Sequence, residues 1–330
     1  LRFFIFLFSC RNFHIIYYIL FNNKLNNFMN YKSYKVLGIM SGTSLDGVDI
    51  SLIKTDGKIV RRLNKNYYKK FSSDTFNCIN ELIKNNTQKF KDTEQLKYTE
   101  NLVTNEYIKS IEESGLIDEC DIIGLHGQTI YHSPKYGKTI QIGDAITIAN
   151  YFKKKIVYNF RFNDIFNGGQ GAPLAPIYHK SIIEELNLEL PACIINLGGI
   201  ANISYWDGRE LIGFDTGPAN YLMDKFMRTK FNASYDKNGK IASTGKINFK
   251  VFSQLMKDPF FKRKFPKSLD VKYFDKFFDT NIISKINDFD LITTLCEFTV
   301  STIASSINML PKKPKVIICC GGGANNNYLI

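Results

Sequence analysis

The sequence is poor in the residues from which metal sites and disulfide frameworks are built. It has four histidines in 330 residues and no His-Glu-x-x-His pattern, which argues against a zinc site. Its seven cysteines are odd in number and include no Cys-x-x-Cys pair. In a chain of this length, such usage is typical of reduced thiols in the cytoplasm. We therefore predict a cytoplasmic protein.

The sequence also lacks an uninterrupted apolar run of the ~20 residues that a membrane helix needs. Residues 1–8 and 14–21 are apolar, but a polar segment separates them and no small-residue cleavage site follows. The chain does not begin with methionine. We expect Met29 to be the true start and residues 1–28 to be upstream sequence. A membrane or targeting segment is the alternative for residues 1–28; we otherwise predict no membrane partner.

Acidic residues are fewer than basic ones: 31 Asp and Glu against 43 Lys and Arg give a formal net charge of +12. The lysines are scattered along the chain, with small clusters only at 153–155 and 262–264. Proteins that bind nucleic acid instead gather positive charge on one face or stripe. We expect a solvated basic surface, an anionic small-molecule substrate and no nucleic-acid partner.

The composition is that of a globular protein, with 44% hydrophobic and 22% charged residues, and the length suits about two domains. Residues 34–39 predict a strand, 40–47 a glycine-rich turn, and 48–52 a second strand with period-2 alternation. The same pattern of strand, glycine turn and strand returns at 192–205. We predict a duplicated α/β architecture with domains at 29–162 and 163–330.

Hydrophobic periodicity predicts the remaining elements. Helices are expected at 74–83, 93–111, 177–185, 221–227, 249–256 and 291–310. Further strands are expected at 121–125, 139–142, 156–160 and 316–320, with another ending at Phe214.

The first glycine turn is a candidate phosphate site. It is no P-loop, because Gly47 is followed by a strand and not by Lys-Ser/Thr and a helix. A turn of Gly, Ser and Thr can nevertheless aim N–H groups and hydroxyls at one anion. Asp46 could hold Mg²⁺ through water. An ordinary hairpin with an Asp-Gly turn is the alternative.

Two other glycine segments strengthen this prediction. Gly198 and Gly199 would face the first turn if the two halves enclosed a cleft, and two such hairpins could clamp the phosphates of a nucleotide. The triple glycine 321–323 follows a strand and would let backbone approach a ring or sugar closely. A simple strand-to-helix connection is the alternative for this segment.

Several polar residues follow predicted strands. Asp215 could be a general base near the phosphates, or the N-cap of the next helix. Gln128, Thr129 and His126 follow the strand 121–125, at the edge where α/β sheets usually bind ligands; a locally bonded turn is the alternative. Arg161 could pair with a carboxylate or phosphate, or lie on the surface.

Taken together, these segments resemble the anhydro-N-acetylmuramic acid kinase family, in the family's order. The resemblance implies the α/β fold of that actin-like, ribonuclease-H-like superfamily: two domains, each a mixed sheet flanked by helices, with an interdomain ATP cleft. The matching segments are Gly38–Asp49, His126–Thr129, Gln141–Asp144, Gly168–Leu174, Asn196–Asn202, Phe214–Pro218 and Cys320–Gly323.

The resemblance also implies an activity. An ATP- and Mg²⁺-dependent kinase would open the anhydro ring of 1,6-anhydro-N-acetylmuramic acid with water and phosphorylate O6, giving N-acetylmuramate 6-phosphate in peptidoglycan recycling. Asp215 would be the base, and Arg161, His126, Gln128 and Thr129 would bind the sugar. ATP would contact Ser41, Gly42, Thr43, Ser44, Leu45, Asp46, Gly47, Val48, Gly198, Gly199, Gly321, Gly322 and Gly323.

Three alternative functions and the oligomeric state stay open. The protein could be another sugar or sugar-acid kinase of the superfamily, a nucleotide-switched binding protein, or an inactive truncated product. A homodimer is compatible with the sequence.

The sequence departs from the family's pattern at three places. Asn159–Asp164 reads Asn-Phe-Arg-Phe-Asn-Asp where the family has Asp-Phe-Arg-Arg-Arg-Asp, which predicts a thinner basic lining around the sugar. Pro266–Lys272 departs from the family's Pro-Lys-Ser-Thr-Gly-Arg-Glu after Ser268. The chain ends soon after Gly323, where the family continues, so we expect a C-terminal truncation.

Overall fold

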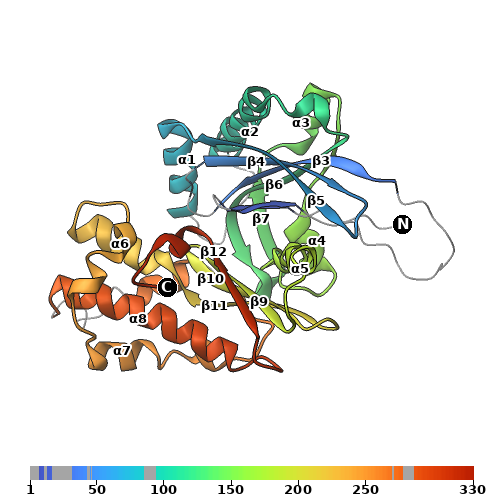
Figure 1. Cartoon of the computed structure of the whole chain (residues 1–330). Coiled ribbons are helices and arrows are strands. Elements are labelled where there is room, and N and C mark those ends of the chain that lie inside the picture. The colour runs from blue at the N-terminus through green and yellow to red at the C-terminus, as the bar shows by residue number, and fades with distance from the viewer. Residues whose placement is uncertain are drawn as a thin grey trace. The chain divides into compact units, whose positions relative to one another are not determined.

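Figure 1 shows the computed structural model of the chain, which describes residues 7–10, 13–16, 32–42, 45, 47–84, 94–269, 271–277 and 286–330. The chain divides into two compact units, Leu1–Ser181 and Ile182–Ile330. This division falls later than the predicted one at 162 and 163. The segment after that point belongs to the first unit because Arg161 bonds both to His126 and to the backbone of Gly171.

The first unit is built on a mixed sheet in which the strand order is β5-β4-β3-β6-β7, with β8 also paired to β6. The β3–β4, β4–β5 and β6–β7 pairs are antiparallel, and the β3–β6 and β6–β8 pairs are parallel. Its elements are β3 (Tyr34–Ser41), β4 (Gly47–Thr55), β5 (Val60–Lys70), α1 (Ser73–Lys84), α2 (Glu94–Ser114), β6 (Ile122–Ser133), β7 (Lys138–Ile142), α3 (Ala145–Phe152), β8 (Lys155–Val157) and α4 (Phe160–Phe166). The helix α5 (Pro176–Glu185) contains the boundary between the two units. A separate antiparallel pair joins β1 (Leu7–Cys10) to β2 (Phe13–Ile16).

The core of the first unit lies between this sheet and its helices. Val36 and Leu37 of β3 point to opposite faces of the sheet and are both fully buried, because a central strand is covered on both faces. Val103, Tyr107 and Ile111 lie four residues apart on α2, so they share one face of the helix and join the same cluster.

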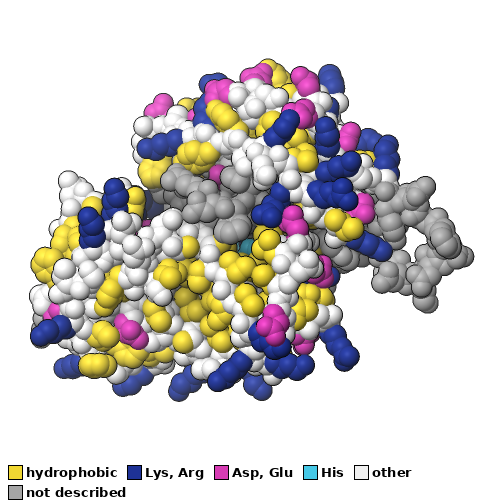
Figure 2. Space-filling view, viewed as in Figure 1, with side chains coloured by type: hydrophobic (Ala, Val, Ile, Leu, Met, Phe, Trp, Pro, Cys, Tyr) yellow, Lys and Arg dark blue, Asp and Glu magenta, His cyan; other side chains and the backbone are white. Residues whose placement is uncertain are grey.

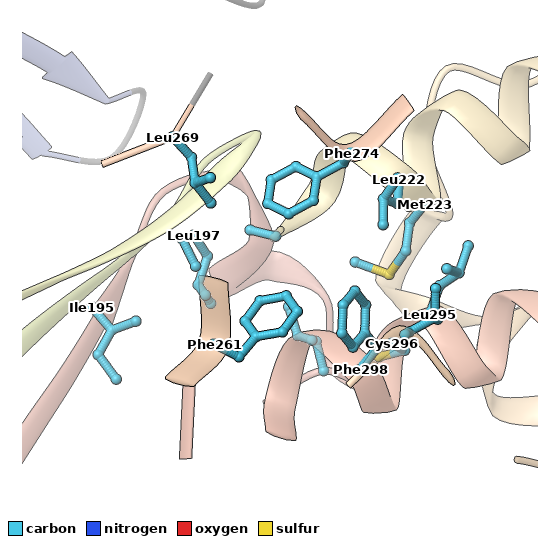
Figure 3. Close-up of a cluster of buried hydrophobic side chains, with 14 of the residues drawn as sticks. Ile195, Leu197, Leu222, Met223, Phe261, Leu269, Phe274, Leu295, Cys296 and Phe298 are labelled. Atoms are coloured by element: carbon cyan, nitrogen blue, oxygen red, sulfur yellow. The ribbon is translucent and has the colours of Figure 1, made fainter. Parts of the chain in front are cut away.

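The second unit has a sheet of order β11-β10-β9-β12, in which β12 is parallel to β9 and the other pairs are antiparallel. The elements are β9 (Ala192–Leu197), β10 (Ile200–Trp206), β11 (Leu211–Pro218), α6 (Asn220–Lys230), α7 (Phe249–Leu255), α8 (Asp288–Ile307) and β12 (Val316–Cys320), with short 3₁₀ turns at Pro259–Lys262, Val271–Phe277 and Gly322–Asn325 among others. Asn287 caps α8 by accepting a bond from the Asp290 N–H at 2.9 Å. Buried side chains of α8, Leu295 and Phe298 among them, form the cluster drawn in Figure 3.

The two units share one topology. In each, three antiparallel strands are followed by a fourth that lies beside the first of them and parallel to it: β5-β4-β3-β6 and β11-β10-β9-β12. This shared arrangement confirms the predicted α/β class with mixed sheets flanked by helices, and the ribonuclease-H-like fold.

Two predicted strands are wrong at their ends. The strand expected at 121–125 is β6, which continues to Ser133, so His126, Gln128 and Thr129 lie within the strand and the alternative of a locally bonded turn is wrong. The expected strand at 156–160 is β8, which stops at Val157, and α4 begins at Phe160. Asn159 has a φ of 61°, a left-handed conformation that ends an extended chain and that asparagine tolerates better than most residues. Arg161 is therefore in the first turn of a helix.

Candidate active site

The predicted site residues fall into two groups, one in each unit. The first surrounds the turn between β3 and β4, in which Ser41 pairs with Val48 at the base of the hairpin. Leu45 is buried and has a φ of 57°, and its N–H donates to the Gly42 carbonyl at 3.1 Å. The predicted ATP and magnesium residues Thr43, Ser44 and Asp46 lie outside the described residues.

Side chains of two neighbouring elements form hydrogen bonds to this hairpin. Ser41 Oγ and Tyr107 Oη share a buried hydrogen bond of 2.5 Å, and burial raises the pKa of Tyr107, so the phenol stays protonated. Gln128, which is completely buried, donates from Nε2 to the Gly42 carbonyl at 3.2 Å. The turn is thus attached to both α2 and β6. Sequence periodicity predicted Tyr107 only as a core residue, because nothing in the sequence shows which strand end its hydroxyl reaches.

Gly47 is required by the neighbouring strand. A Cβ at this position would lie 2.2 Å from the carbonyl oxygen of Lys69 on β5. The glycine therefore permits close strand pairing at the base of the hairpin.

Arg161 and His126 form the second part of the first group. Arg161 Nε donates to His126 Nε2 at 2.9 Å, and Arg161 Nη1 donates to the Gly171 carbonyl at 2.8 Å. Since the guanidinium can only donate, His126 Nε2 must accept, and its Nδ1–H donates to the Gly127 carbonyl at 2.7 Å. Burial lowers the pKa of His126 to about 3, with a further contribution from the Arg161 charge. His126 is a neutral acceptor that orients Arg161.

The loop after α4 is fixed by the same helix. Asp164 Oδ2 accepts a bond from the Gly171 N–H at 2.7 Å. Thr129, on β6, accepts from Gln141 Nε2 at 3.3 Å. The predicted sugar-binding residues Arg161, His126, Gln128 and Thr129 thus come from β6 and α4 of one unit.

The second unit carries the Gly198–Gly199 turn between β9 and β10. The Gly198 carbonyl accepts from the Asn220 N–H at 2.9 Å, and the Gly199 carbonyl accepts from the Ala219 N–H at 3.0 Å. These bonds hold the turn against the start of α6. A Cβ on Gly198 would meet only ordinary contacts, the nearest being 3.4 Å, so the fold itself leaves room there.

The triple glycine divides into two kinds of position. Gly321 has a φ of 86°, and a Cβ there would lie 2.8 Å from the Leu197 backbone. A Cβ on Gly323 would lie 2.7 Å from the Leu197 side chain. Gly322 is different, because its Cβ would meet only Asn220 Nδ2, at 3.8 Å. The packing of the chain itself therefore requires glycine at 321 and 323. At Gly322 there is room for a side chain or for a ligand.

Asp215 lies inside β11 and caps no helix. The strand continues to Pro218, and the residue at the N-cap of α6 is Ala219, so the capping alternative is wrong. The Asp215 side chain is 5% exposed. Its N–H donates to the Lys267 carbonyl at 3.0 Å, and its Oδ2 accepts from the Leu269 N–H at 2.8 Å. A buried carboxylate held by a backbone donor is well fixed to accept a proton.

Buried histidines predict how stability depends on pH. Burial lowers the pKa of His126 to about 3 and that of His179 to about 4, whereas both should titrate near ~6.5 when unfolded. The stabilisation that the neutral histidines give is fully present above about pH 6.5. It is lost as the pH falls towards the pKa values of the folded protein. We expect each buried histidine to contribute a loss of about 1 kcal/mol in the free energy of unfolding between pH 8 and 5.5, measured by urea denaturation. His132, whose pKa burial also lowers to about 3, acts in the same direction, whereas Asp224, whose pKa burial raises to about 7, acts in the opposite direction. His179→Gln should lose about 1 kcal/mol less over that range; an equal loss in both proteins would contradict this assignment.

The described part of the chain contains no group of three or more His, Cys, Asp or Glu side chains that could hold a metal ion. Magnesium that enters with a nucleotide needs only one or two protein carboxylates and keeps several waters. Among the described helices, none is both long and apolar enough to cross a membrane. On the face shown in Figure 2, Lys and Arg side chains are scattered among other residues.

Two ribonuclease-H-like sheets, each with a glycine turn between its first two strands, define the class of the actin-like ATPases and sugar kinases. The sequence pattern of the anhydro-N-acetylmuramic acid kinase family matches residues 34–330. The chain is 37% identical over 304 residues to the anhydro-N-acetylmuramic acid kinase of Hydrogenovibrio crunogenus, covering 89% of this chain and 81% of the relative. It is 38% identical over 304 residues to that of Pelagibacter ubique, covering 87% and 79%.

The chain therefore belongs to the anhydro-N-acetylmuramic acid kinase family and is a carbohydrate kinase. Among solved structures, the ROK hexokinase of Thermus thermophilus is similar over 89% of this chain and 96% of its own, with 10% identity and a TM-score of 0.36.

Proposed function

We propose that the protein opens the anhydro ring of 1,6-anhydro-N-acetylmuramic acid with water while ATP phosphorylates O6. Water forms a bond to C1, the C1–O6 bond breaks, and O6 receives the γ-phosphoryl group as ADP leaves. The products are N-acetylmuramate 6-phosphate and ADP, as peptidoglycan recycling in the cytoplasm requires. The match to the family over residues 34–330 carries this proposal.

Asp215 would take the proton of the attacking water. Its carboxylate is buried, and the Leu269 N–H fixes one oxygen at 2.8 Å. The reaction needs a base, a phosphate clamp and positioning, and it needs no covalent nucleophile.

Phosphate binding is assigned to residues 41–48 in the first unit and to Gly198, Gly199 and Gly322 in the second. Backbone N–H groups at such turns bind anions, and Gly198 and Gly322 leave space that a Cβ would take. Gly321 and Gly323 would contribute by shaping this backbone. Mg²⁺ bound with ATP would neutralise phosphate charge, with Asp46 as the candidate protein carboxylate.

Arg161 would bind the sugar by donating to an acceptor such as the carboxylate of the muramic acid. His126 and Gln128 are buried, so we assign them supporting roles: His126 orients Arg161, and Gln128 fixes the Gly42 carbonyl. Thr129 would complete the polar edge of β6.

ADP release with different sugars tests the proposal against two of its three alternatives, another sugar kinase and a nucleotide-switched binding protein. We expect release that depends on anhydro-N-acetylmuramic acid and is at least ~100-fold slower with glucose or N-acetylglucosamine, since a site built for polar groups rejects analogues that lack them. Equal rates with a hexose would favour another sugar kinase. Slow release that no sugar stimulates would favour a nucleotide-switched binding protein. Sedimentation of the same sample would test the predicted homodimer.

A further inference from the structure

Lys267 is a buried cation next to the proposed base. Its side chain is 5% exposed, and its ammonium group donates to the Phe260 carbonyl at 3.4 Å. The same nitrogen lies 4.7 Å from the centre of the Phe260 ring and 5.7 Å from that of Phe214. Among the residues the structure describes, no carboxylate lies within ion-pair distance of it.

Burying such a cation costs free energy. An ammonium group in apolar surroundings loses its hydration, and one long carbonyl bond and two ring faces replace only part of it. A methionine would fill the same space without that cost, and apolar residues often match or exceed buried charges in stability. Fold stability alone therefore does not account for a lysine here.

The segment that carries Lys267 runs alongside the strand that carries Asp215. Phe265 stacks on Phe214 with ring centres 5.0 Å apart. The Lys267 carbonyl accepts from the Asp215 N–H, and the Leu269 N–H donates to the Asp215 carboxylate. The Leu269 side chain belongs to the buried cluster of Figure 3, which fixes the far end of the segment. Lys267 thus supplies one of the two backbone contacts that hold the base.

The charges around Lys267 act in opposite directions. Burial is the main cause that lowers the pKa of Lys267 to about 8; the exposed Arg263 contributes in the same direction, and Asp215 opposes both. Of the other charged groups on the turns packed against Phe260, Asp258 and Lys276 form an ion pair of 2.5 Å with each other, Asp275 pairs with Lys225 at 2.7 Å, and Lys262 is exposed. Asp215 is thus the anion that favours the charged form of Lys267, and by reciprocity Lys267 favours the charged form of Asp215.

We propose that Lys267 is a positioning residue for Asp215: its buried charge keeps the carboxylate ionised, and its backbone holds the carboxylate in place. This inference rests on the proposed role of Asp215 as the base. It explains why the segment keeps a lysine at 267 although it departs from the family's pattern two residues later.

The test is the pH profile of kcat/KM in Lys267→Met, with Lys264→Met as the control because Lys264 is exposed on the same segment. Removing the positive charge should shift the acidic limb of the profile to higher pH by about half a pH unit or more, because the carboxylate of Asp215 would then be protonated more easily. The loss of kcat/KM should therefore be several-fold larger at pH 5.5 than at pH 8. The thermal midpoint should stay level or rise, and ATP affinity should be unchanged. Lys264→Met should match the parent protein throughout.

An acidic limb that stays in place in folded Lys267→Met would overturn the proposal, whatever happens to kcat. If Lys267→Met does not fold, Lys267→Gln is measured in its place. If neither neutral variant folds, the charge is needed for the fold, and this result would also overturn the proposal. Asp215→Asn separates this outcome from failure of the proposed function. If that variant is active, Asp215 is not the base and both claims fall; if it is inactive while the limb in Lys267→Met is unmoved, only the claim for Lys267 falls.

Discussion

Replacing Asp215 by asparagine should lower the turnover of anhydro-N-acetylmuramic acid by about 10²–10⁴-fold, the usual contribution of a positioned acid or base. The amide oxygen of Asn can still accept the Leu269 N–H bond that now ends on Asp215 Oδ2. What the amide cannot do is take a proton from water. We therefore expect the fold and the affinity for ATP to survive while turnover is lost, as measured by ADP release and calorimetry.

Glu210→Gln is a matched control for this variant. Glu210 is exposed on the turn between β10 and β11 of the same sheet, so the substitution also removes one carboxylate charge but touches no proposed site residue. Its turnover should equal that of the parent protein. Near-normal turnover by folded Asp215→Asn would remove Asp215 from the mechanism, because its position inside β11 leaves no capping role to explain the result.

The second large effect concerns two neighbouring glycines that should respond in opposite ways. Gly321→Val should destabilise the protein by several kcal/mol, because its φ of 86° is unfavourable for a β-branched residue and its Cβ would lie 2.7 Å from Asn196 Oδ1. Gly322→Val should leave the free energy of unfolding within about 1 kcal/mol of the parent value, because its Cβ meets only ordinary contacts. It should instead weaken ATP binding by about tenfold or more, since the side chain would take the space assigned to the nucleotide.

Denaturation and ATP titration of both variants separate the two roles. If Gly322→Val binds ATP normally, Gly322 is not part of the nucleotide site and the triple glycine is only a connection. If Gly321→Val is as stable as the parent protein, the close approach of Gly321 to β9 is not what requires glycine.

Much of the fold follows from local sequence pattern. The alternation in residues 48–52 and the glycine turns at 42–47 and 198–199 predict both hairpins, and these are β3–β4 and β9–β10. The duplication is visible because each hairpin opens its own sheet. The end of β8 was not predictable in this way, because the left-handed conformation of Asn159 leaves the pattern of apolar residues unchanged.

The site was predictable only where a motif marks it. Asp215 and Arg161 lie within segments that resemble the family. The roles of Tyr107 and Lys267 could not be predicted from the sequence, because each residue acts through a contact with a residue far away in the chain. Tyr107 contacts Ser41, and Lys267 contacts Asp215. A hydrophobic pattern records that α2 is buried on one side but not what its tyrosine hydroxyl meets. Only tertiary structure brings such pairs together.

The most direct test of the whole account is the fate of the oxygen of water. The protein is incubated with ATP and anhydro-N-acetylmuramic acid in ¹⁸O-labelled water, and the products are analysed by mass spectrometry before the sugar can exchange its C1 oxygen with solvent. We expect one ¹⁸O at C1 of N-acetylmuramate 6-phosphate and none in its phosphate group, because water attacks carbon while O6 receives the phosphoryl group. Label in inorganic phosphate, with the anhydro sugar unchanged, would instead show simple hydrolysis of ATP and would contradict the account.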